Sequence, residues 1–296
     1  MSILVSIILP TFNRREELKK AINSVIDQTY TNWELIIIDN FSSDETKEYI
    51  NKFNDKRIKF YQIKNNGIIA KSRNYGIDKA SGEIISFLDS DDWWNKDKLH
   101  KSLEYMSKGY DFTFHRLVKH NIKKKYLFAK KTYAYKLKYP IFENLIRGGN
   151  CIPNSSVSVN RKLILEIGKF NESEKLVGAE DFDGWLRISK LTNKFIEIPK
   201  ALGYCTIGES NFSNDKNLLR NIQTLEELHL KDNCKIIISA SFYYQRARIS
   251  QRKKSYQMAF KFYRTALKNK PTTSIFIRSL LGIFMIGVLS IYKYKN

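Results

Sequence analysis

Short apolar runs alternate with helical patterns through the first hundred residues, and this alternation constrains the fold more than any other feature of the chain. Four runs have the length of β-strands and are rich in β-branched residues: VSIILP, ELIIID, IKFYQI and EIISFL. Between the first two, apolar residues recur at helical spacing over residues 18–26. Near-continuous apolar strands that alternate with helices predict an α/β fold with a parallel sheet covered by helices on both faces.

The start of the chain carries its own signals. The segment MSILVSIILPTF has no basic residues ahead of its apolar run, so we expect a first buried strand and not a signal peptide. Asn13 with Glu16, and Ser42 with Glu45, have the spacing of a capping box, which predicts that helices begin at these two places.

Length and cysteine usage limit the class of protein. A chain of 296 residues, 43% of them hydrophobic, can form one large globular domain with an appendage. Its three cysteines, Cys151, Cys205 and Cys234, are far apart and show no metal-ligand spacing. We therefore expect small core side chains in a reducing compartment and neither a disulfide framework nor a zinc site.

Positive charge is concentrated in two tracts of a chain whose net charge is +21. Residues 233–296 contain thirteen Lys or Arg and no Asp or Glu, and residues 119–138 contain eight lysines and no acid. Such charge indicates an anionic partner, which is either nucleic acid or a membrane surface with acidic lipids.

The segment after Pro271, SIFIRSLLGIFMIGVLSIYKYKN, fits a membrane surface better than a membrane span. Its uncharged run, residues 279–292, is 14 residues long, short of the ~20 that a spanning helix needs. Arg278, Lys293 and Lys295 flank this run, which is typical of an interfacial amphipathic helix. A buried core helix is the alternative. The preceding YQMAFKFYRTALKNKP resembles one helix of a tetratricopeptide repeat, but a single copy predicts ordinary helical-hairpin packing.

Aromatic residues alternate with lysines at period two in the middle of the chain. The residues concerned are Tyr126, Phe128, Tyr133 and Tyr135. The pattern could bind single-stranded nucleic acid, but no nucleic-acid motif accompanies it, so we favour a solvated hairpin with one basic face.

Polar residues follow three of the predicted strands at the point where each strand ends. Thr11, Asn13 and Arg14 follow the first, Asp39 ends the second, and Asp89 follows the fourth. Ligands of open α/β sheets bind beyond the carboxyl ends of the strands, so we expect these groups to line one site.

The stretch FLDSDDWW places three carboxylates, Asp89, Asp91 and Asp92, within four positions. Their mutual repulsion is costly unless a cation or a ligand offsets it. Two carboxylates one residue apart at a strand end can hold Mg²⁺ or Mn²⁺, which commonly completes its shell with phosphate oxygens. The cation would neutralise charge on a diphosphate leaving group.

Four linked motifs resemble those of the family 2 glycosyltransferases. VSIILPTFNR, ELIIIDNFSSDET, NNGIIAKSRNYGIDKASGEIISFLDSDDWW and GAEDFDGWLR follow one another in the order and spacing of that family. The resemblance covers roughly residues 3–215 and implies an inverting enzyme of the GT-A fold, a Rossmann-like mixed sheet that binds nucleotide sugars. Similar enzymes build bacterial O-antigen, capsule and other exopolysaccharides.

The resemblance also implies residue roles. Thr11, Asn13 and Arg14 would lie along the nucleotide, Asp39 would accept a hydrogen bond from the base, and Arg73 would reach the charged part of the donor. Asp89 would contact ribose or sugar, and Asp91 is the metal-binding end of the DxD motif. The complete donor-binding set that we predict is Pro10, Thr11, Phe12, Asn13, Arg14, Asp39, Asn66, Gly67, Arg73, Asp89 and Ser90.

GAEDFDGWLR supplies the predicted base. In an inverting displacement an acceptor hydroxyl attacks the anomeric carbon while the nucleoside diphosphate leaves from the opposite face, and a carboxylate must take the hydroxyl proton. The resemblance assigns this role to Asp181, assisted by Glu180. Asp183 and Arg187 have the spacing of an ion pair, and Trp185 is expected in the core. On the acceptor side we expect Asp92 and Trp93, together with Ser155 and Ser156 on a strand CIPNSSVSV.

The chain departs from the family pattern after Tyr204. Cys205 and Ile207 stand where the family often has Arg and His. The histidine commonly supplements the metal site, so we expect weaker cation affinity, or substitution by His115 or a water.

These observations predict a transferase domain over residues 1–217, with a nucleotide-sugar-binding half (1–110) and an acceptor-side half (111–217), and a basic helical tail over 218–296. We expect metal-dependent transfer of a hexose or N-acetylhexosamine from a nucleotide sugar, with UDP favoured, to a saccharide on undecaprenyl pyrophosphate. The tail would hold the enzyme peripherally on the cytoplasmic face of the inner membrane. A nucleotidyltransferase, which would release pyrophosphate, and a nucleic-acid-binding protein are the alternatives, and we expect no nucleic-acid partner.

Overall fold

The structure is a computed structural model, and it describes residues 2–121, 130–132, 135–207, 214–232, 235–236 and 239–294. The chain divides into two compact units. The first comprises Met1–Lys136 and Ile152–Asn211, and the second comprises Leu137–Cys151 and Phe212–Asn296. Two predicted features lie outside the described residues. They are Cys234 and most of the aromatic hairpin, including Tyr126, Phe128 and Tyr133.

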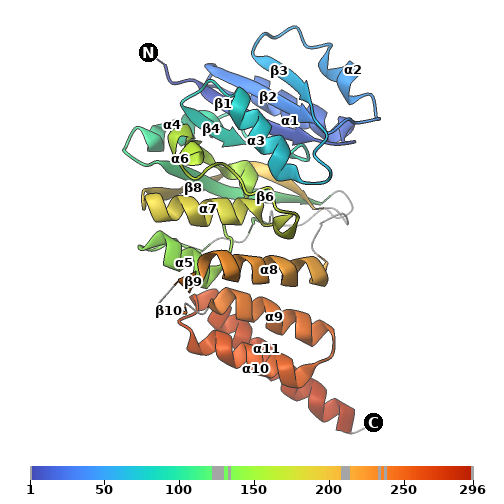
Figure 1. Ribbon diagram of the computed structural model, residues 1–296, viewed down its shortest axis with the longest axis vertical. Helices are drawn as coiled ribbons and strands as arrows, with labels where there is room; N and C mark the ends of the chain where they lie inside the picture. The colour runs from blue at the N-terminus through green and yellow to red at the C-terminus, as the bar shows by residue number, and fades with distance from the viewer. Residues whose placement is uncertain are drawn as a thin grey trace. The chain divides into compact units, whose positions relative to one another are not determined.

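The first unit is built on a mixed eight-stranded sheet with the strand order β3-β2-β1-β4-β7-β6-β8-β5 (Figure 1). Its parallel part consists of β1 (Val5–Thr11), β2 (Trp33–Asp39), β3 (Ile58–Gln62) and β4 (Ile84–Phe87). These four strands confirm the prediction from the apolar runs. The remaining strands are β5 (Asp92–Trp94), β6 (Phe112–Asn121), β7 (Ser158–Asn160) and β8 (Phe195–Ile207).

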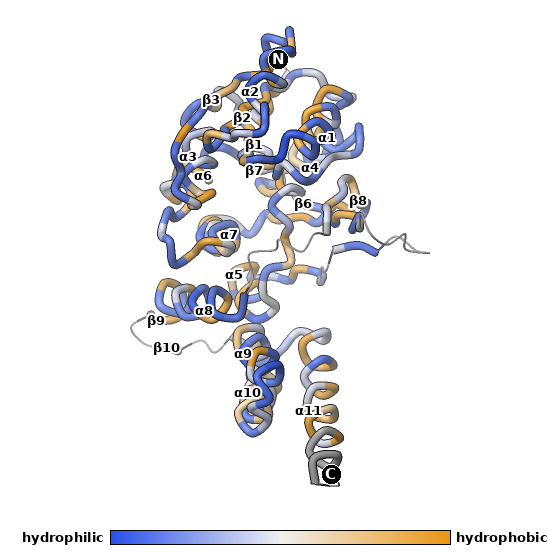
Figure 2. Tube along the Cα trace, turned by 90° about the vertical axis from the view of Figure 1, so that its right-hand side faces the viewer, coloured by the Kyte–Doolittle hydropathy of each residue, from blue (hydrophilic) through white to orange (hydrophobic). Residues whose placement is uncertain are grey.

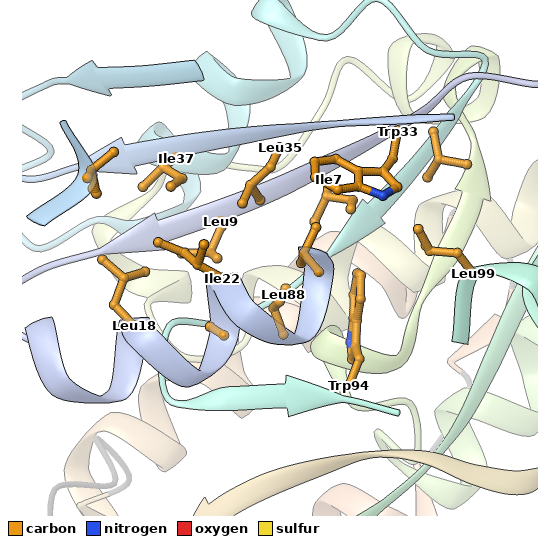
Figure 3. Packing of buried hydrophobic residues seen from close by; sticks show 14 of the residues in the cluster. Ile7, Leu9, Leu18, Ile22, Trp33, Leu35, Ile37, Leu88, Trp94 and Leu99 are labelled. Carbon is orange, nitrogen blue, oxygen red and sulfur yellow. The ribbon is translucent and has the colours of Figure 1, made fainter. Parts of the chain in front are cut away.

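Alternate residues of the central strands face opposite layers of helices. On one face Ile7, Leu9, Leu35 and Ile37 pack in a buried cluster with α1 (Arg15–Ile26) and α4 (Lys98–Met106) (Figure 3). On the other face α3 (Ile69–Lys79) approaches so closely that a Cβ on Gly76 would lie 2.8 Å from Ile8. Near-continuous apolar strands are required because both faces of the sheet are covered.

The same second face carries α7 (Glu180–Leu191). Trp185 of this helix is fully buried, as predicted, and its ring lies 4.9 Å from that of Phe112 and 6.0 Å from that of Phe87. The predicted ion pair between Asp183 and Arg187 is present at 2.7 Å. Two short helices, α2 (Thr46–Ile50) and α6 (Arg161–Glu166), and a 3₁₀ turn, η2 (Glu174–Leu176), complete the connections.

The two predicted capping boxes are wrong, although helices begin nearby. The N-cap of α1 is Arg14, and the Asn13 side chain instead accepts a hydrogen bond from the Ser43 N–H (2.8 Å). Ser42 in turn contacts Asp39, and α2 begins at Thr46. These side chains tie the loop after β1 to the loop after β2, because a contact between two loops can satisfy a polar group as well as a cap can.

The predicted strand CIPNSSVSV is also wrong over most of its length. Residues 154–156 form a 3₁₀ turn, η1 (Asn154–Ser156), and β7 begins at Ser158. Pro153 precedes this turn with φ −65°, a value that proline fixes and that suits the start of a turn. Both serines of η1 are buried.

The second unit is helical in its described part, as predicted for the tail. Its helices are α5 (Ile141–Gly148), α8 (Asp215–His229), α9 (Ala240–Arg252), α10 (Tyr256–Lys268) and α11 (Thr273–Tyr294). A two-residue strand pair, β9 (Lys231–Asp232) and β10 (Lys235–Ile236), lies between α8 and α9 in the sequence. In the described residues no helix is long and apolar enough to span a bilayer.

Candidate active site

The carboxyl ends of β1, β2 and β4 meet at one edge of the sheet, as the strand pattern predicted. Thr11 and Asp39 are register partners across β1 and β2. Pro10 and Thr11 are buried, and Phe12, the next residue, is 51% exposed beyond the strand. Parallel strands bring their carboxyl ends together, so residues far apart in sequence line the same edge.

Asp39 is a buried carboxylate held by neighbouring polar groups. Its oxygens accept hydrogen bonds from the Ser42 N–H (3.0 Å) and from Gln62 Nε2 (3.0 Å), and the Ser42 hydroxyl donates a further bond. A carboxylate has about four acceptor positions, so these three donors leave Asp39 about one position for another donor. Its contact with a nucleotide base remains a prediction.

The loop after β3 offers open backbone beside this edge. Asn66 and Gly67 both have positive φ, 54° and 78°, and a Cβ on Gly67 would meet no atom within 4 Å. Asn65 fixes the loop, because its side-chain oxygen accepts from the Gly67 N–H (2.9 Å). A loop of this form leaves room for a ligand to approach the main chain.

Arg73 joins the end of β4 to the start of α7. Its guanidinium donates to Asp89 Oδ1 (2.9 Å) and to Glu180 Oε1 (2.6 Å), and its side chain is 4% exposed. The pKa of Arg73 is raised, because the two carboxylates and Asp181 outweigh the effect of burial. Asp89, the first carboxylate of the DxD motif, and the Glu-Asp pair of α7 therefore lie around one buried cation.

The η1 turn positions Asp89, and sequence reasoning missed its first residue. Asn154 Nδ2 donates to Asp89 Oδ1 (3.0 Å), and the Asp89 N–H donates to Ser155 Oγ (3.0 Å). The indole N–H of Trp94 donates to the Ser155 carbonyl (2.6 Å) and holds the turn in place. No local sequence signal points to Asn154, because its role depends on a contact across 65 positions of the chain.

Most of the remaining acceptor-side candidates are buried or hydrogen-bonded to other parts of the protein. Ser156 Oγ donates to the Pro153 carbonyl (2.7 Å). Asp92 is 8% exposed, and burial together with Asp89 and Asp91 raises its pKa well above the usual range. Trp93 is half-buried and stacks on Tyr204 with 5.2 Å between ring centroids. Trp93 alone among these four is not buried, although Lys20 Nζ also lies 5.5 Å from its ring centroid.

Asp91 forms an ion pair with Arg14 and is 31% exposed. Its pKa is raised, first by burial and then by the neighbouring Asp89, against the lowering effect of Arg14. Ser90, between the two carboxylates, is buried. Asp91 is thus an accessible carboxylate whose negative charge is only partly compensated by the protein.

Asp181 has the protonation behaviour of a general base. Burial of its carboxylate and the adjacent Glu180 raise its pKa to about 7, although Arg73 and the Phe182 N–H favour the charged form. Glu180 is turned away toward Arg73 and also accepts from the Gly178 N–H (2.7 Å). A base with a pKa near the operating pH combines a sufficient deprotonated fraction with a high proton affinity.

Three buried polar atoms at this edge have no hydrogen-bond partner among the described residues. They are Thr11 Oγ1, Arg73 Nε and Asn154 Oδ1. Unsatisfied buried polar groups are rare in folded proteins, and they mark places that a ligand or water completes. All three belong to the residues that surround Asp89 or end β1.

Asp89 and Asp91 supply two carboxylates of the kind that bind a divalent cation. Asp89 and Asp91 repel each other, and a cation would relieve that repulsion. Within the described ranges no group of three His, Cys, Asp or Glu side chains is placed to hold one metal ion. Mg²⁺ and Mn²⁺ bind to sites with only one or two protein carboxylates when phosphate oxygens or waters complete the coordination shell.

His115 does not supplement this set, and that part of the prediction is wrong. It is fully buried, its Nδ1 lies 3.0 Å from the Arg116 carbonyl, and burial together with nearby Lys98 lowers its pKa to about 3. Cys205 lies opposite Asp92 in the β5–β8 ladder, where burial raises the pKa of the thiol to about 12. A thiol with such a pKa is a poor metal ligand at neutral pH.

The amino-acid sequence around this site matches a known protein family. The family model described as Glycosyl transferase family 2 matches residues 6–166, which are 161 of the 296 residues. The chain belongs to glycosyl transferase family 2. The match covers the ends of β1, β2 and β4, Arg73 and the η1 turn.

Two curated relatives come from Escherichia coli. Each is described as a UDP-Glc:alpha-D-GlcNAc-diphosphoundecaprenol beta-1,3-glucosyltransferase. WfgD is 43% identical over 105 residues, which are 36% of this chain and 42% of WfgD. WfaP is 28% identical over 247 residues, which are 81% of this chain and 92% of WfaP. The chain spans less than half the length of the first curated relatives that it matches.

Solved structures of other proteins share the fold. Staphylococcus aureus TarS, residues 1–349 in complex with UDP, superposes with a TM-score of 0.64 at 16% identity, over 99% of this chain and 92% of that one. The mannosyltransferase PcManGT of Pyrobaculum calidifontis, in complex with GDP-Man and Mn²⁺, gives 0.58 at 17% identity, over 98% and 81%. These likenesses confirm the predicted GT-A fold for the family 2 domain.

Proposed function

We propose that this family 2 enzyme transfers a hexosyl group, with glucose favoured, from a UDP-sugar to a saccharide hydroxyl on a diphospholipid, with inversion at the anomeric carbon. The observation that supports the proposal is the Arg73 bridge, because it links Asp89 of the DxD motif to Glu180, the neighbour of Asp181. The activity named for WfgD and WfaP supports the donor and acceptor classes. The same activity also supports inversion, because transfer with inversion from α-linked UDP-glucose gives the β linkage named for both relatives.

In the proposed reaction the acceptor hydroxyl gives its proton to Asp181 as its oxygen attacks the anomeric carbon. UDP leaves from the opposite face of the sugar, and the bond from the anomeric carbon to the diphosphate oxygen breaks in the same step. Arg73 holds Glu180 through a hydrogen bond, and the proton goes to the adjacent Asp181, whose pKa is raised to about 7. The developing positive charge on the sugar ring is stabilised by the surrounding carboxylates.

The residues that would hold a divalent cation are Asp91 and Asp89. When bound, the cation would neutralise negative charge on the departing diphosphate. Arg14 now pairs with Asp91 and lies at the end of β1, so it can turn to a phosphate when Asp91 engages the ion. Mn²⁺ in the PcManGT complex supports this cofactor class for the fold.

The reaction itself is tested by product analysis. Purified protein is incubated with UDP-Glc, UDP-Gal or UDP-GlcNAc and a synthetic GlcNAc-diphospholipid, and nucleotide and lipid products are separated by mass spectrometry. We expect one disaccharide-diphospholipid and an equal amount of UDP. Release of pyrophosphate would instead support a nucleotidyltransferase, and unchanged acceptor with all donors would contradict the proposed transfer.

Replacement of the predicted metal ligand gives a first testable result. Asp91→Asn is expected to weaken UDP binding in the presence of MnCl₂ by about tenfold, equivalent to about 1.4 kcal/mol, because one of the two ligand carboxylates loses its charge. Titration calorimetry with and without MnCl₂ measures this. Asp97→Asn is the matched control, since Asp97 caps α4 away from the site. Equal manganese dependence in both variants would refute the role of Asp91.

A further inference from the structure

The terminal helix α11 packs through one narrow stripe. Ile275, Ser279, Gly282 and Ile286 are buried and follow one another at spacings of four, three and four residues. They contact α9 and α10, and the approach is close at Gly282, where a Cβ would lie 2.3 Å from the ring of Tyr263. Glycine at this position therefore sets α11 firmly against the other two helices.

Most of the remaining described surface of α11 is apolar and exposed, although Arg278 is exposed as well. Its accessible large side chains are Phe276, Ile277, Leu280, Leu281, Phe284, Met285 and Val288, which we call the outer face. Phe284 is 70% exposed and Leu281 is 56% exposed. In Figure 2 hydrophobic positions, drawn in orange, recur along the coloured part of α11. A helix surface that is largely apolar is normally buried, so we expect another molecule or a membrane to cover the outer face.

The outer face stands in a strongly basic segment. Residues 233–296 have thirteen Lys or Arg and no acid. Arg246 and Arg252 form ion pairs with Glu226 and Asp215 of α8, but no acidic residue within the segment offsets the others. On α10, exposed Phe260 and Met258 lie among basic residues, with Arg264 5.8 Å over the Phe260 ring. Apolar and cationic side chains are therefore interleaved on the second unit.

We propose that the outer face of α11 lies in the headgroup region of a bilayer that contains anionic lipids. An interfacial helix needs an apolar face for the acyl boundary and cations for the lipid headgroups, and this segment supplies both. A second copy of the chain fits less well as the cover, because it would bring two acid-free cationic segments together. The inference goes beyond the sugar-transfer chemistry and does not depend on it.

Vesicle flotation of the full-length protein tests the proposal. The probe is a set of phosphatidylcholine vesicles with and without about one third phosphatidylglycerol. We expect binding to the anionic vesicles, and we expect the double variant Leu281→Glu/Phe284→Glu to bind at least about tenfold more weakly, because two large apolar side chains no longer enter the bilayer. The matched control is Leu228→Glu, which alters an exposed leucine (48%) on α8 and should bind like the natural chain.

Substitutions on the outer face are preferable to removing residues 272–296, since that deletion would uncover Tyr263 and Ala259. Thermal unfolding monitored by circular dichroism should be the same for the double variant and the natural chain. Absence of binding to anionic vesicles would overturn the proposal. It would also be overturned by a lipid-free dimer that the double variant abolishes, which would make a second copy the cover. Sugar transfer to a soluble acceptor, measured in parallel, reports separately on the proposed function.

Discussion

Asp181→Asn is expected to lower kcat by about 10²–10⁴-fold, the range that general-base catalysis contributes. The amide that replaces the carboxylate cannot take the acceptor proton, while the contacts predicted for the nucleotide lie on other elements of the fold. UDP affinity should therefore stay within about twofold, since Asp181 would contact the acceptor and not the nucleotide. The measurements are steady-state kinetics with UDP-Glc and calorimetric titration with UDP.

Asp78→Asn serves as the control for that variant, because Asp78 forms an exposed ion pair with Lys169 away from the site. It should retain the activity of the natural chain. If Asp181→Asn is equally active, the base is another carboxylate and the assignment fails. If it loses UDP affinity in proportion to activity, its effect is on donor binding and not on proton transfer.

The raised pKa of Asp181 gives that residue a signature in pH dependence. The activity should rise with pH through about 7 as the base loses its proton.

The free energy of unfolding should change with pH in the opposite sense to activity. The unfolded pKa is about 3.9 and the folded one is about 7, so the folded state binds the proton more tightly between them. The free energy of unfolding should then fall as pH rises over this window, and Asp181→Asn should lack that part of the fall.

Arg73→Met is expected to destabilise the first unit by about 3–5 kcal/mol, the typical effect of breaking a buried ion pair. The substitution preserves much of the apolar volume but leaves the Asp89 and Glu180 carboxylates next to each other without their cation. Urea unfolding monitored by tryptophan fluorescence measures the change. Arg57→Met, which removes a half-exposed partner of Asp55, should cost about 0–1 kcal/mol.

The double variant Arg73→Met/Glu180→Gln separates charge from packing. If uncompensated charge causes the loss, removing one carboxylate should restore part of the stability, so that the two changes are not additive. Additive losses would mean that Arg73 acts through its packing against Phe170, whose ring centroid lies 5.9 Å from the guanidinium carbon.

Much of the fold follows from the sequence because its signals are local. The apolar runs in the first hundred residues identified β1 to β4, and the rule for strand ends placed Thr11, Asp39 and Asp89 on one edge. The capping boxes failed because Asn13 pairs with Ser43, 30 residues away in another loop, and Ser42 pairs with Asp39 at the end of β2. The role of Asn154 and the pairing of Arg73 with Glu180 depend on contacts across 65 and 107 positions, which no local pattern encodes.

In the proposed mechanism the acceptor is deprotonated at Asp181 on the face of the sugar opposite the departing UDP. The most direct measurement of this mechanism is the anomeric configuration of the product, read by proton NMR of the disaccharide-diphospholipid formed from α-linked UDP-Glc. We expect a β-linked glucosyl residue as the sole product. An α-linked product would contradict it, because retention cannot arise from a single displacement at this site.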